Sequence, residues 1–301
     1  MIDQLDEILS KSGSIWIEGI KNQKGSEVLM SKLMAMELPT CFEMIEDEQG
    51  PQDFSFTLYQ ISKAIAQIDI SIAYNVLSQL ILNYFFSENE VNKSLGFVCR
   101  DGFLSSGTRS GERIHLIELC SGSEQVNFGT NVNDDCETYP VMKSSGLFLS
   151  TNKDLELQSF DSRKVGKLRK YIKSILFGIL SGISYDILVE AFKYSKVRTS
   201  AGKAIVHHQA IALRLGNIAI DYESLDSLMK SVLQNSDSQI DTSALLETLS
   251  LYSHNICKEA VQVAGGHGYV DGLPLKRLYE SSKGYIAFLL MVYPGENNAA
   301  S

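Results

Sequence analysis

A cluster of glycines near the C-terminal end of the sequence could bind a phosphate group. Gly265, Gly266 and Gly268 follow a helical repeat that contains Ala260 and Val263. Glycine can adopt left-handed backbone and lets another molecule approach the main chain closely. Successive backbone N–H groups can then form a concavity that binds an anion. The same glycines also fit an ordinary corner between two helices, so the cluster by itself leaves both interpretations open.

A second set of polar residues lies earlier in the chain. Arg198 ends a predicted helix, where its planar guanidinium could bind two phosphate oxygens or complement the helix dipole. His207 and His208 precede Gln209 at a predicted helix start. We expect both histidines to have a surface or capping role rather than to act as a base or a ligand. The sequence contains no HExxH segment, Walker-type phosphate loop or nucleophile elbow, and no metal site is predicted.

Both sets of residues must be positioned by residues 161–301, whose apolar spacing predicts an antiparallel four-helix bundle. Apolar side chains repeat there at intervals of three and four, which places them on one face of each helix. These repeats run over Val165–Leu188, Ile205–Leu228 and Leu245–Ile256, and a last helical segment begins at Pro274. A turn is expected near Thr199–Lys203.

The rest of the chain predicts a mostly α-helical fold with a small β-domain. Residues 1–96 are expected to form a helical N-terminal domain, and the clearest repeat predicts one helix over Phe56–Phe86. Asp69 interrupts this apolar repeat and is better explained as a hydrogen-bonding carboxylate than as a site. Residues 97–160 contain short β-type runs separated by turn residues, which predict the β-domain. Within it, Ser105–Gly111 could hold an anion, but we expect a hairpin turn.

The composition disfavours several classes of protein. The chain has 301 residues, a net charge of −9 and a pI near 5.1, which argues against nonspecific binding to nucleic acid or to an anionic membrane. Five scattered cysteines with no CxxC pair fit the reduced thiols of a cytoplasmic protein better than disulfides or a zinc site. The acidic N-terminus is unlike a signal peptide, and we expect no apolar run of membrane-spanning length.

Two stretches of the sequence resemble the acyl-CoA dehydrogenase family. The string AVQVAGGHGYVDGLPLKRLY matches the family's Gln-x-x-Gly-Gly-x-Gly-[Tyr/Phe] loop and the Pro-x-x-[Arg/Lys]-Leu element that follows it, at Gln262, Gly265, Gly266, Gly268, Tyr269, Pro274, Arg277 and Leu278. A second stretch follows the family's spacing at Tyr194, Arg198, Gly202, Gln209 and Leu213. A fainter similarity covers the middle of the repeat over Phe56–Phe86.

This resemblance implies a fold, a cofactor and an assembly. The implied fold is acyl-CoA-dehydrogenase-like, with a helical N-domain, a reduced β-domain and a C-terminal four-helix bundle. The implied cofactor is FAD, whose ADP part would contact Arg198, Gln209 and the Gln262–Gly266 loop, including Gly265 and Gly266. The substrate would be an acyl thioester of CoA or of a carrier protein. The chain would assemble as a homodimer or homotetramer, or as a heteromer with a fuller family member.

The base that would perform the family's α,β-dehydrogenation is missing from its usual positions. A carboxylate is needed to remove the α-proton while the β-hydrogen leaves as hydride to the flavin. Aligning the chain without a gap puts Leu289 at the usual glutamate position, and aligning on Tyr293–Gly295 puts Pro294 there. The alternative position on the first bundle helix is occupied by Ile172. Glu296 is the nearest acidic residue and the one candidate for the base.

Two functional hypotheses follow from these features. In the first, the chain is a flavin-dependent acyl-thioester oxidoreductase or a subunit of one, with a partner supplying the base and most of the flavin pocket. In the second, it is a catalytically silent member of the same fold that acts as a binding or structural subunit. The family segments that hold the flavin ring are absent from residues 97–160, which is compatible with both hypotheses.

Overall fold

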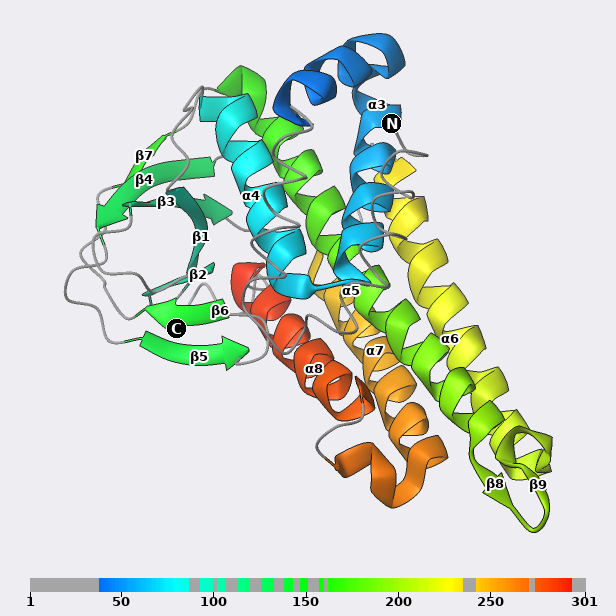
Figure 1. The fold of residues 1–301 in the computed structure, drawn as a ribbon. Coiled ribbons are helices and arrows are strands. Elements are labelled where there is room, and N and C mark those ends of the chain that lie inside the picture. The colour runs from blue at the N-terminus through cyan, green and yellow to red at the C-terminus, as the bar shows by residue number, and fades with distance from the viewer. Residues whose placement is uncertain are drawn as a thin grey trace.

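The computed structural model of the protein describes residues 38–86, 93–99, 102–106, 113–119, 126–132, 138–142, 147–150, 157–159, 162–234, 242–270 and 274–293. Helices α3 (Leu38–Ala66) and α4 (Ile70–Phe86) precede a β-sheet, and helices α5 to α8 follow it. Figure 1 shows long helices packed side by side, with the curved sheet beside one part of them. This arrangement confirms the predicted mostly α-helical fold with a small β-domain and a C-terminal bundle.

Helices α3 and α4 are separate, so the prediction of one continuous helix over Phe56–Phe86 is wrong. The break lies at Gln67–Asp69, where Oδ1 of Asp69 accepts the backbone N–H of Ile72 at 3.1 Å. This bond satisfies a donor in the first turn of α4, as N-cap aspartates do. Asp69 therefore has the hydrogen-bonding role expected for it. Helix α3 is itself kinked at Gly50, whose φ is 82°.

Within the described residues, the β-sheet has seven strands in the order β5-β6-β2-β1-β3-β4-β7. Its neighbours are antiparallel except β1 and β3, which are parallel. Strand β1 begins four residues before the predicted start of the β-domain at residue 97. The strands are β1 (Lys93–Cys99), β2 (Gly102–Ser106), β3 (Arg113–Leu119), β4 (Val126–Val132), β5 (Thr138–Met142), β6 (Leu147–Ser150) and β7 (Leu157–Ser159). The turn predicted within Ser105–Gly111 lies mostly outside the described residues.

In the described parts of residues 162–293, the bundle consists of four long helices and two short 3₁₀ helices. They are α5 (Ser162–Val197), η1 (Ile205–His207), α6 (Gln209–Gln234), α7 (Thr242–Ala264), η2 (Gly265–Tyr269) and α8 (Pro274–Val292). Helix α5 runs through the centre, in contact with α3, α4, α6, α7 and α8. Its Gly178 lets α3 approach so closely that a Cβ there would lie 2.4 Å from the carbonyl oxygen of Tyr59.

The central position of α5 explains its unusual apolarity. Residues Lys164–Val197 are long and apolar enough to cross a membrane, which contradicts the expectation that no segment reaches that length. However, 67% of the most apolar window is buried against the rest of the chain. A helix surrounded by other helices must be apolar on most of its circumference. The apolarity of α5 is therefore accounted for by packing.

Candidate functional site

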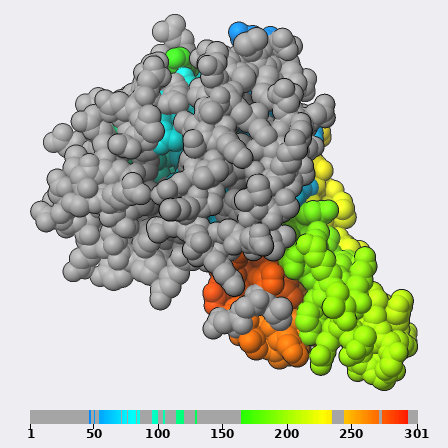
Figure 2. Space-filling model, in the orientation of Figure 1, coloured from blue at the N-terminus to red at the C-terminus, as the bar shows by residue number. Residues whose placement is uncertain are grey.

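The residues predicted to contact FAD lie in two groups at one end of the bundle. Arg198 follows the last residue of α5, and Gln209 is the first residue of α6. Gln262 lies in the last turn of α7, and Gly265 and Gly266 begin η2. All five residues are exposed. Figure 1 shows both groups at the lower end of the bundle, and Figure 2 shows that end exposed on the surface.

A tight hairpin connects Arg198 to the start of α6. Its two strands, β8 (Thr199–Ser200) and β9 (Lys203–Ala204), pair antiparallel across Ala201 and Gly202. Both turn residues have positive φ, 50° for Ala201 and 79° for Gly202. Positive φ at both central residues is typical of a two-residue type I′ turn. The turn predicted near Thr199–Lys203 is confirmed in this form.

Backbone hydrogen bonds hold the hairpin against the bundle. The carbonyl of Arg198 accepts the N–H of Ile205 at 2.8 Å. A ring nitrogen of His208 lies 3.1 Å from the carbonyl oxygen of Ser200, and His207 is exposed. These contacts fix the main chain at Arg198 and leave its side chain in solvent. His207 thus lies on the surface, as expected, and His208 is half-buried against the hairpin.

The glycine loop presents bare backbone to open space. A Cβ added to Gly265 or Gly266 would meet no atom within 4 Å. Gly265 also has a φ of 59°, which explains why glycine ends α7 here. Gly268, in contrast, is buried, and a Cβ there would lie 3.0 Å from the carbonyl oxygen of Val261. Gly265 and Gly266 therefore permit a ligand to approach the main chain, whereas Gly268 serves packing.

The hairpin group (Arg198 and Gln209) and the glycine-loop group (Gln262, Gly265 and Gly266) both lie near the C-terminal end of α5, but they are not bonded to each other. The ring of His267 in the loop lies 6.1 Å from the ring of Tyr194 in the last turns of α5. Among the described residues, no hydrogen bond or ion pair connects Arg198 or Gln209 with the Gln262–Gly266 loop. Each group thus offers its own exposed set of donors.

The two described positions where the family would place its base, Leu289 on α8 and Ile172 on α5, are both buried and apolar. The hydroxyl of Tyr285 in α8 donates to the carbonyl of Leu176 in α5 at 3.0 Å. The charge of Arg277, earlier in α8, acts on Asp186, later in α5, so the two helices are antiparallel. Each rises by about 1.5 Å per residue.

The two base positions flank this contact along the two helices. Leu289 is four residues beyond Tyr285, and Ile172 is four residues before Leu176. Their exposed fractions are 0% and 2%. Pro294 and Glu296, the other residues considered for the base, lie outside the described residues.

Aromatic side chains fill the junction of the sheet, α4 and α8 next to these positions. Phe288 lies with its ring centroid 5.8 Å from Tyr74 of α4 and 5.8 Å from Phe97 of β1. Tyr74 and Phe97 are themselves 6.4 Å apart. All three side chains are at most 2% exposed. The three rings are therefore buried together, and Tyr74 and Phe97 also line a small cavity with Ile172.

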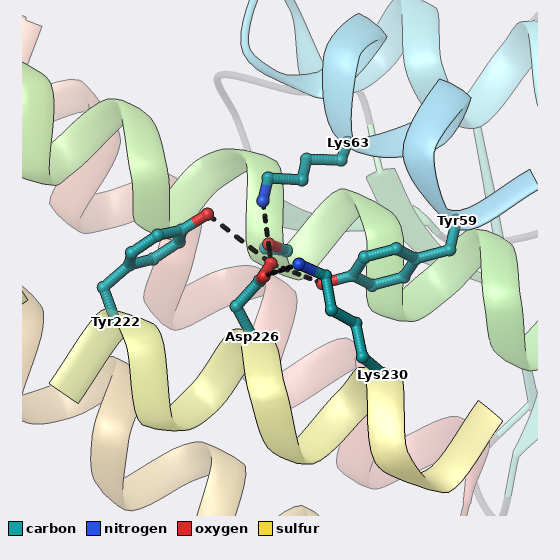
Figure 3. Close-up of polar contacts among 6 residues, drawn as sticks. Tyr59, Lys63, Tyr222, Asp226 and Lys230 are labelled. Carbon is teal, nitrogen blue, oxygen red and sulfur yellow. Dashed lines mark hydrogen bonds and ion pairs between the residues drawn. The ribbon is translucent and has the colours of Figure 1, made fainter. Parts of the chain in front are cut away.

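Sequence reasoning missed a buried carboxylate that joins three helices. Asp226 of α6 accepts the hydroxyl of Tyr59 at 2.6 Å and the ammonium of Lys63 at 2.8 Å, both from α3. It also accepts the hydroxyl of Ser181 in α5, and Lys230 pairs with its second oxygen at 2.6 Å. Figure 3 shows these groups converging on the carboxylate.

The electrostatics of Asp226 favour its charged form. Burial acts to raise its pKa, but the donors from Lys230, Lys63, Ser181 and Tyr59 outweigh burial and hold the pKa well below its usual range. The carboxylate is thus saturated with donors and has no capacity to act as a base. Its place on the inner face of α6, four residues before Lys230, is the one sequence signal that could have identified it.

A second buried carboxylate joins α3, α4 and α5. Glu46 accepts the hydroxyl of Tyr171 at 2.6 Å and is also bonded to Tyr84 and Lys167. Burial acts to raise the pKa of Glu46, but these donors outweigh it, so the pKa is lowered. This cluster ties the N-terminal helices to the bundle. In the described parts of the chain, no group of three or more His, Cys, Asp or Glu residues could hold a metal ion.

Comparisons with known proteins agree with the sequence resemblance. Residues 176–288 match the model of the acyl-CoA dehydrogenase C-terminal domain. The CarC subunit of the caffeyl-CoA reductase–Etf complex of Acetobacterium woodii is 27% identical over 193 residues, which are 60% of this chain and 48% of that protein. The chain therefore spans about half the length of that curated relative.

Solved structures show the same fold. Butyryl-CoA dehydrogenase from Megasphaera elsdenii matches with a TM-score of 0.62 and 15% identity over 99% of this chain and 96% of that chain. The ChsE4–ChsE5 complex from Mycobacterium tuberculosis matches with a TM-score of 0.58 and 14% identity over 95% of this chain and 93% of that chain. At this level of identity the likeness concerns the fold alone.

Proposed function

Because this chain belongs to the acyl-CoA dehydrogenase family, we propose that it is a subunit of a flavin-dependent oxidoreductase acting on an acyl thioester. In this proposal, Arg198, Gln209 and the Gln262–Gly266 loop hold the ADP part of FAD. The main support for this proposal is the open backbone at Gly265 and Gly266, which lies at the same end of the bundle as the exposed Arg198.

The residues present fit the pyrophosphate and adenosine of FAD. Bare N–H groups at Gly265 and Gly266 can donate to phosphate oxygens without a side chain in the way. Arg198 can bind two oxygens through its planar fork, and its backbone is fixed by the β8–β9 hairpin. Gln209 and Gln262 are exposed amides that can bond the adenosine part.

When bound, FAD would supply the oxidant that accepts a hydride from the acyl group. The chain's own residues would bind and orient the cofactor. They would not remove the α-proton, because Leu289 and Ile172 occupy the two base positions and both are buried in apolar surroundings. A fuller family member would supply that carboxylate and the ring-binding part of the pocket. The site would thus be shared between two subunits.

Exposed apolar side chains on the bundle support assembly with another subunit. Leu213 and Ile220 of α6 are 62% and 65% exposed, and Leu251 of α7 is 59% exposed. Large apolar side chains in such positions are typical of subunit interfaces. The similar ChsE4–ChsE5 and caffeyl-CoA reductase–Etf proteins are named as complexes. We place the assembly in the cytoplasm and expect either a homodimer or homotetramer, or a heteromer.

The proposal is tested by titrating FAD into the purified chain, alone and co-expressed with a fuller family member, while recording flavin fluorescence. Arg198→Ala should weaken binding at least tenfold, because it removes a charge-assisted contact of about 1.5–3 kcal/mol. Gly266→Ala should also weaken binding without changing the folded chain, since the added methyl meets open space. Lys196→Ala, a nearby exposed position, is the matched control. Equal binding by Arg198→Ala and Lys196→Ala would refute the assigned contacts.

The packed aromatic junction favours a second candidate function. Tyr74, Phe97 and Phe288 pack against one another beside the base positions, an arrangement that suits a structural subunit that binds no flavin. A chain that binds no FAD, alone or in its assembly, would select this second function.

A further inference from the structure

The β8–β9 hairpin has little within itself to hold its conformation. It projects from the end of the bundle (Figure 1), and two residue pairs join its strands, Thr199 with Ala204 and Ser200 with Lys203. Ala201, the first central residue of the turn, has a φ of 50°, a region that residues with a side chain rarely adopt. Type I′ turns favour Asn, Asp or Gly at this position. Because a two-stranded hairpin is marginally stable at best, this one depends on contacts from outside.

His208 connects the hairpin to helix α6. Its carbonyl oxygen accepts the N–H groups of Ile211 and Ala212 at 2.9 Å, so its main chain caps the start of α6. Its ring Nε2 lies 3.1 Å from the carbonyl oxygen of Ser200. A carbonyl oxygen can only accept a hydrogen bond, so Nε2 carries a proton and donates it. The half-buried ring of His208 therefore ties the first strand of the hairpin to a helix that packs against α5 and α7.

Two further hydrogen bonds act at the base of the hairpin. The N–H of Ile205 donates to the carbonyl oxygen of Arg198 at 2.8 Å, where the chain returns from the hairpin. The ammonium of Lys203 donates to the carbonyl oxygen of His207 at 3.2 Å, but Lys203 is exposed, and water competes for such a contact. Among the hydrogen bonds of the described residues, the one from the ring of His208 is thus the brace that ties the hairpin to α6.

We propose that His208 is a positioning residue for the cofactor site: it keeps the β8–β9 hairpin formed and thereby holds Arg198 in place for the phosphates of FAD. This inference rests on the proposed contact between Arg198 and FAD, and it adds a residue that itself touches no cofactor. If the segment after Arg198 were open in the free chain, cofactor binding would have to order it, and that ordering would lower the affinity. The brace from His208 establishes this order before FAD binds.

Amide hydrogen exchange of the full chain, followed at the backbone N–H of Ile205, tests the brace without any cofactor. His208→Ala should speed this exchange about fivefold, because the loss of one such hydrogen bond increases the open population by about that factor. His208→Gln keeps a donor within reach of the Ser200 carbonyl oxygen and should exchange as slowly as the unmodified chain. His207→Ala is the matched control, since it removes an exposed ring and retains the carbonyl that accepts Lys203.

The FAD affinity of the same variants tests the link to Arg198. His208→Ala should weaken binding about threefold, because the apparent affinity falls with the fraction of chains whose hairpin is formed. The loss should be smaller than in Arg198→Ala, where the contact itself is gone. The midpoint of thermal unfolding should stay unchanged in His208→Ala, because the bond lies at the tip of the bundle. A general structural role of His208 would instead lower that midpoint.

A change in the turn supplies a rescue. Ala201→Asn introduces a residue that type I′ turns favour, and combined with His208→Ala it should return both the exchange at Ile205 and the FAD affinity to within about twofold of the unmodified chain. A stronger turn can replace the missing brace if His208 acts through the hairpin. It could not replace a direct contact between His208 and FAD.

Three results would overturn the proposal. Unchanged exchange at Ile205 in His208→Ala would show that the ring does not hold the hairpin. Faster exchange with unchanged FAD affinity, in a chain whose affinity does fall in Arg198→Ala, would show that the order of the hairpin is irrelevant to the cofactor. If the chain and its assembly bind no FAD, or if Arg198→Ala has no effect, the proposed cofactor contact fails and the positioning role fails with it; the exchange data, which need no cofactor, identify this case.

Discussion

Replacing Asp186 by asparagine should stabilise the protein at neutral pH but not in acid. Asp186 lies on α5, largely removed from solvent. Burial and the nearby charge of Glu190 raise its pKa from 3.8 to about 6, and Lys193 and Arg277 only partly offset this effect. At pH 7 the folded chain therefore holds a charge that its surroundings disfavour.

The size of the effect follows from the shift in pKa. A difference of about 2 between the folded and unfolded pKa, at about 1.36 kcal/mol for each unit, gives about 3 kcal/mol. Residual contact with solvent reduces this figure, and we expect about 2 kcal/mol. Because the folded pKa of Asp186 is the higher one, the folded chain binds more protons between pH 4 and pH 6. Stability therefore falls as the pH rises through this window and stays constant above it.

Urea unfolding of the full chain at pH 3.8 and at pH 7.5 measures this effect. Asp186→Asn should gain about 2 kcal/mol at pH 7.5 relative to the unmodified chain and little at the lower pH. Glu247→Gln, an exposed position on α7, removes the same charge from the surface and is the control. The reasoning would be refuted if Asp186→Asn were equally stable to the unmodified chain at pH 7.5, or destabilised there.

Two further predictions concern the contact between α3 and the bundle. Asp226→Ala should destabilise the chain by about 3 kcal/mol in urea unfolding, because it leaves Lys63 and the hydroxyl of Tyr59 without their shared acceptor; an unchanged midpoint would show that the cluster contributes nothing. Gly178→Ala should cost about 2 kcal/mol, since its Cβ would lie 2.4 Å from the Tyr59 carbonyl oxygen. Gly166→Ala on the same helix meets open space and should stabilise it by up to about 1 kcal/mol; equal effects of the two glycine substitutions would contradict the close approach.

The bundle could be predicted from the sequence because its signals are local. Apolar residues repeat along α5, α6 and α7 over many turns, and Pro274 marks the start of α8. The positions of Arg198 and Gln209 at helix ends also follow from short-range patterns. Their proposed role in binding FAD comes from the resemblance to the family and stays a prediction.

The break between α3 and α4 could not be predicted from periodicity. The apolar repeat continues across Gln67–Asp69, so the pattern fits one long helix as well as two. The hydrogen bond from the N–H of Ile72 to the Asp69 carboxylate caps the start of α4 as a separate helix. Aspartate favours such caps. An aspartate can also lie within a continuous helix, so the sequence alone does not distinguish one helix from two.

Long-range pairs were equally inaccessible. Tyr59 and Asp226 are separated by 167 positions in the chain, and nothing in either local sequence identifies the other.

The most direct test of the proposed function is the visible absorption spectrum of the purified chain after incubation with excess FAD and removal of free cofactor by gel filtration. The same measurement is made on its assembly with a co-expressed fuller family member. We predict a flavin band that elutes with the protein in the assembly and is lost in Arg198→Ala. The absence of a flavin band from both the chain and the assembly would contradict the proposed cofactor site and leave the structural subunit as the function of this fold.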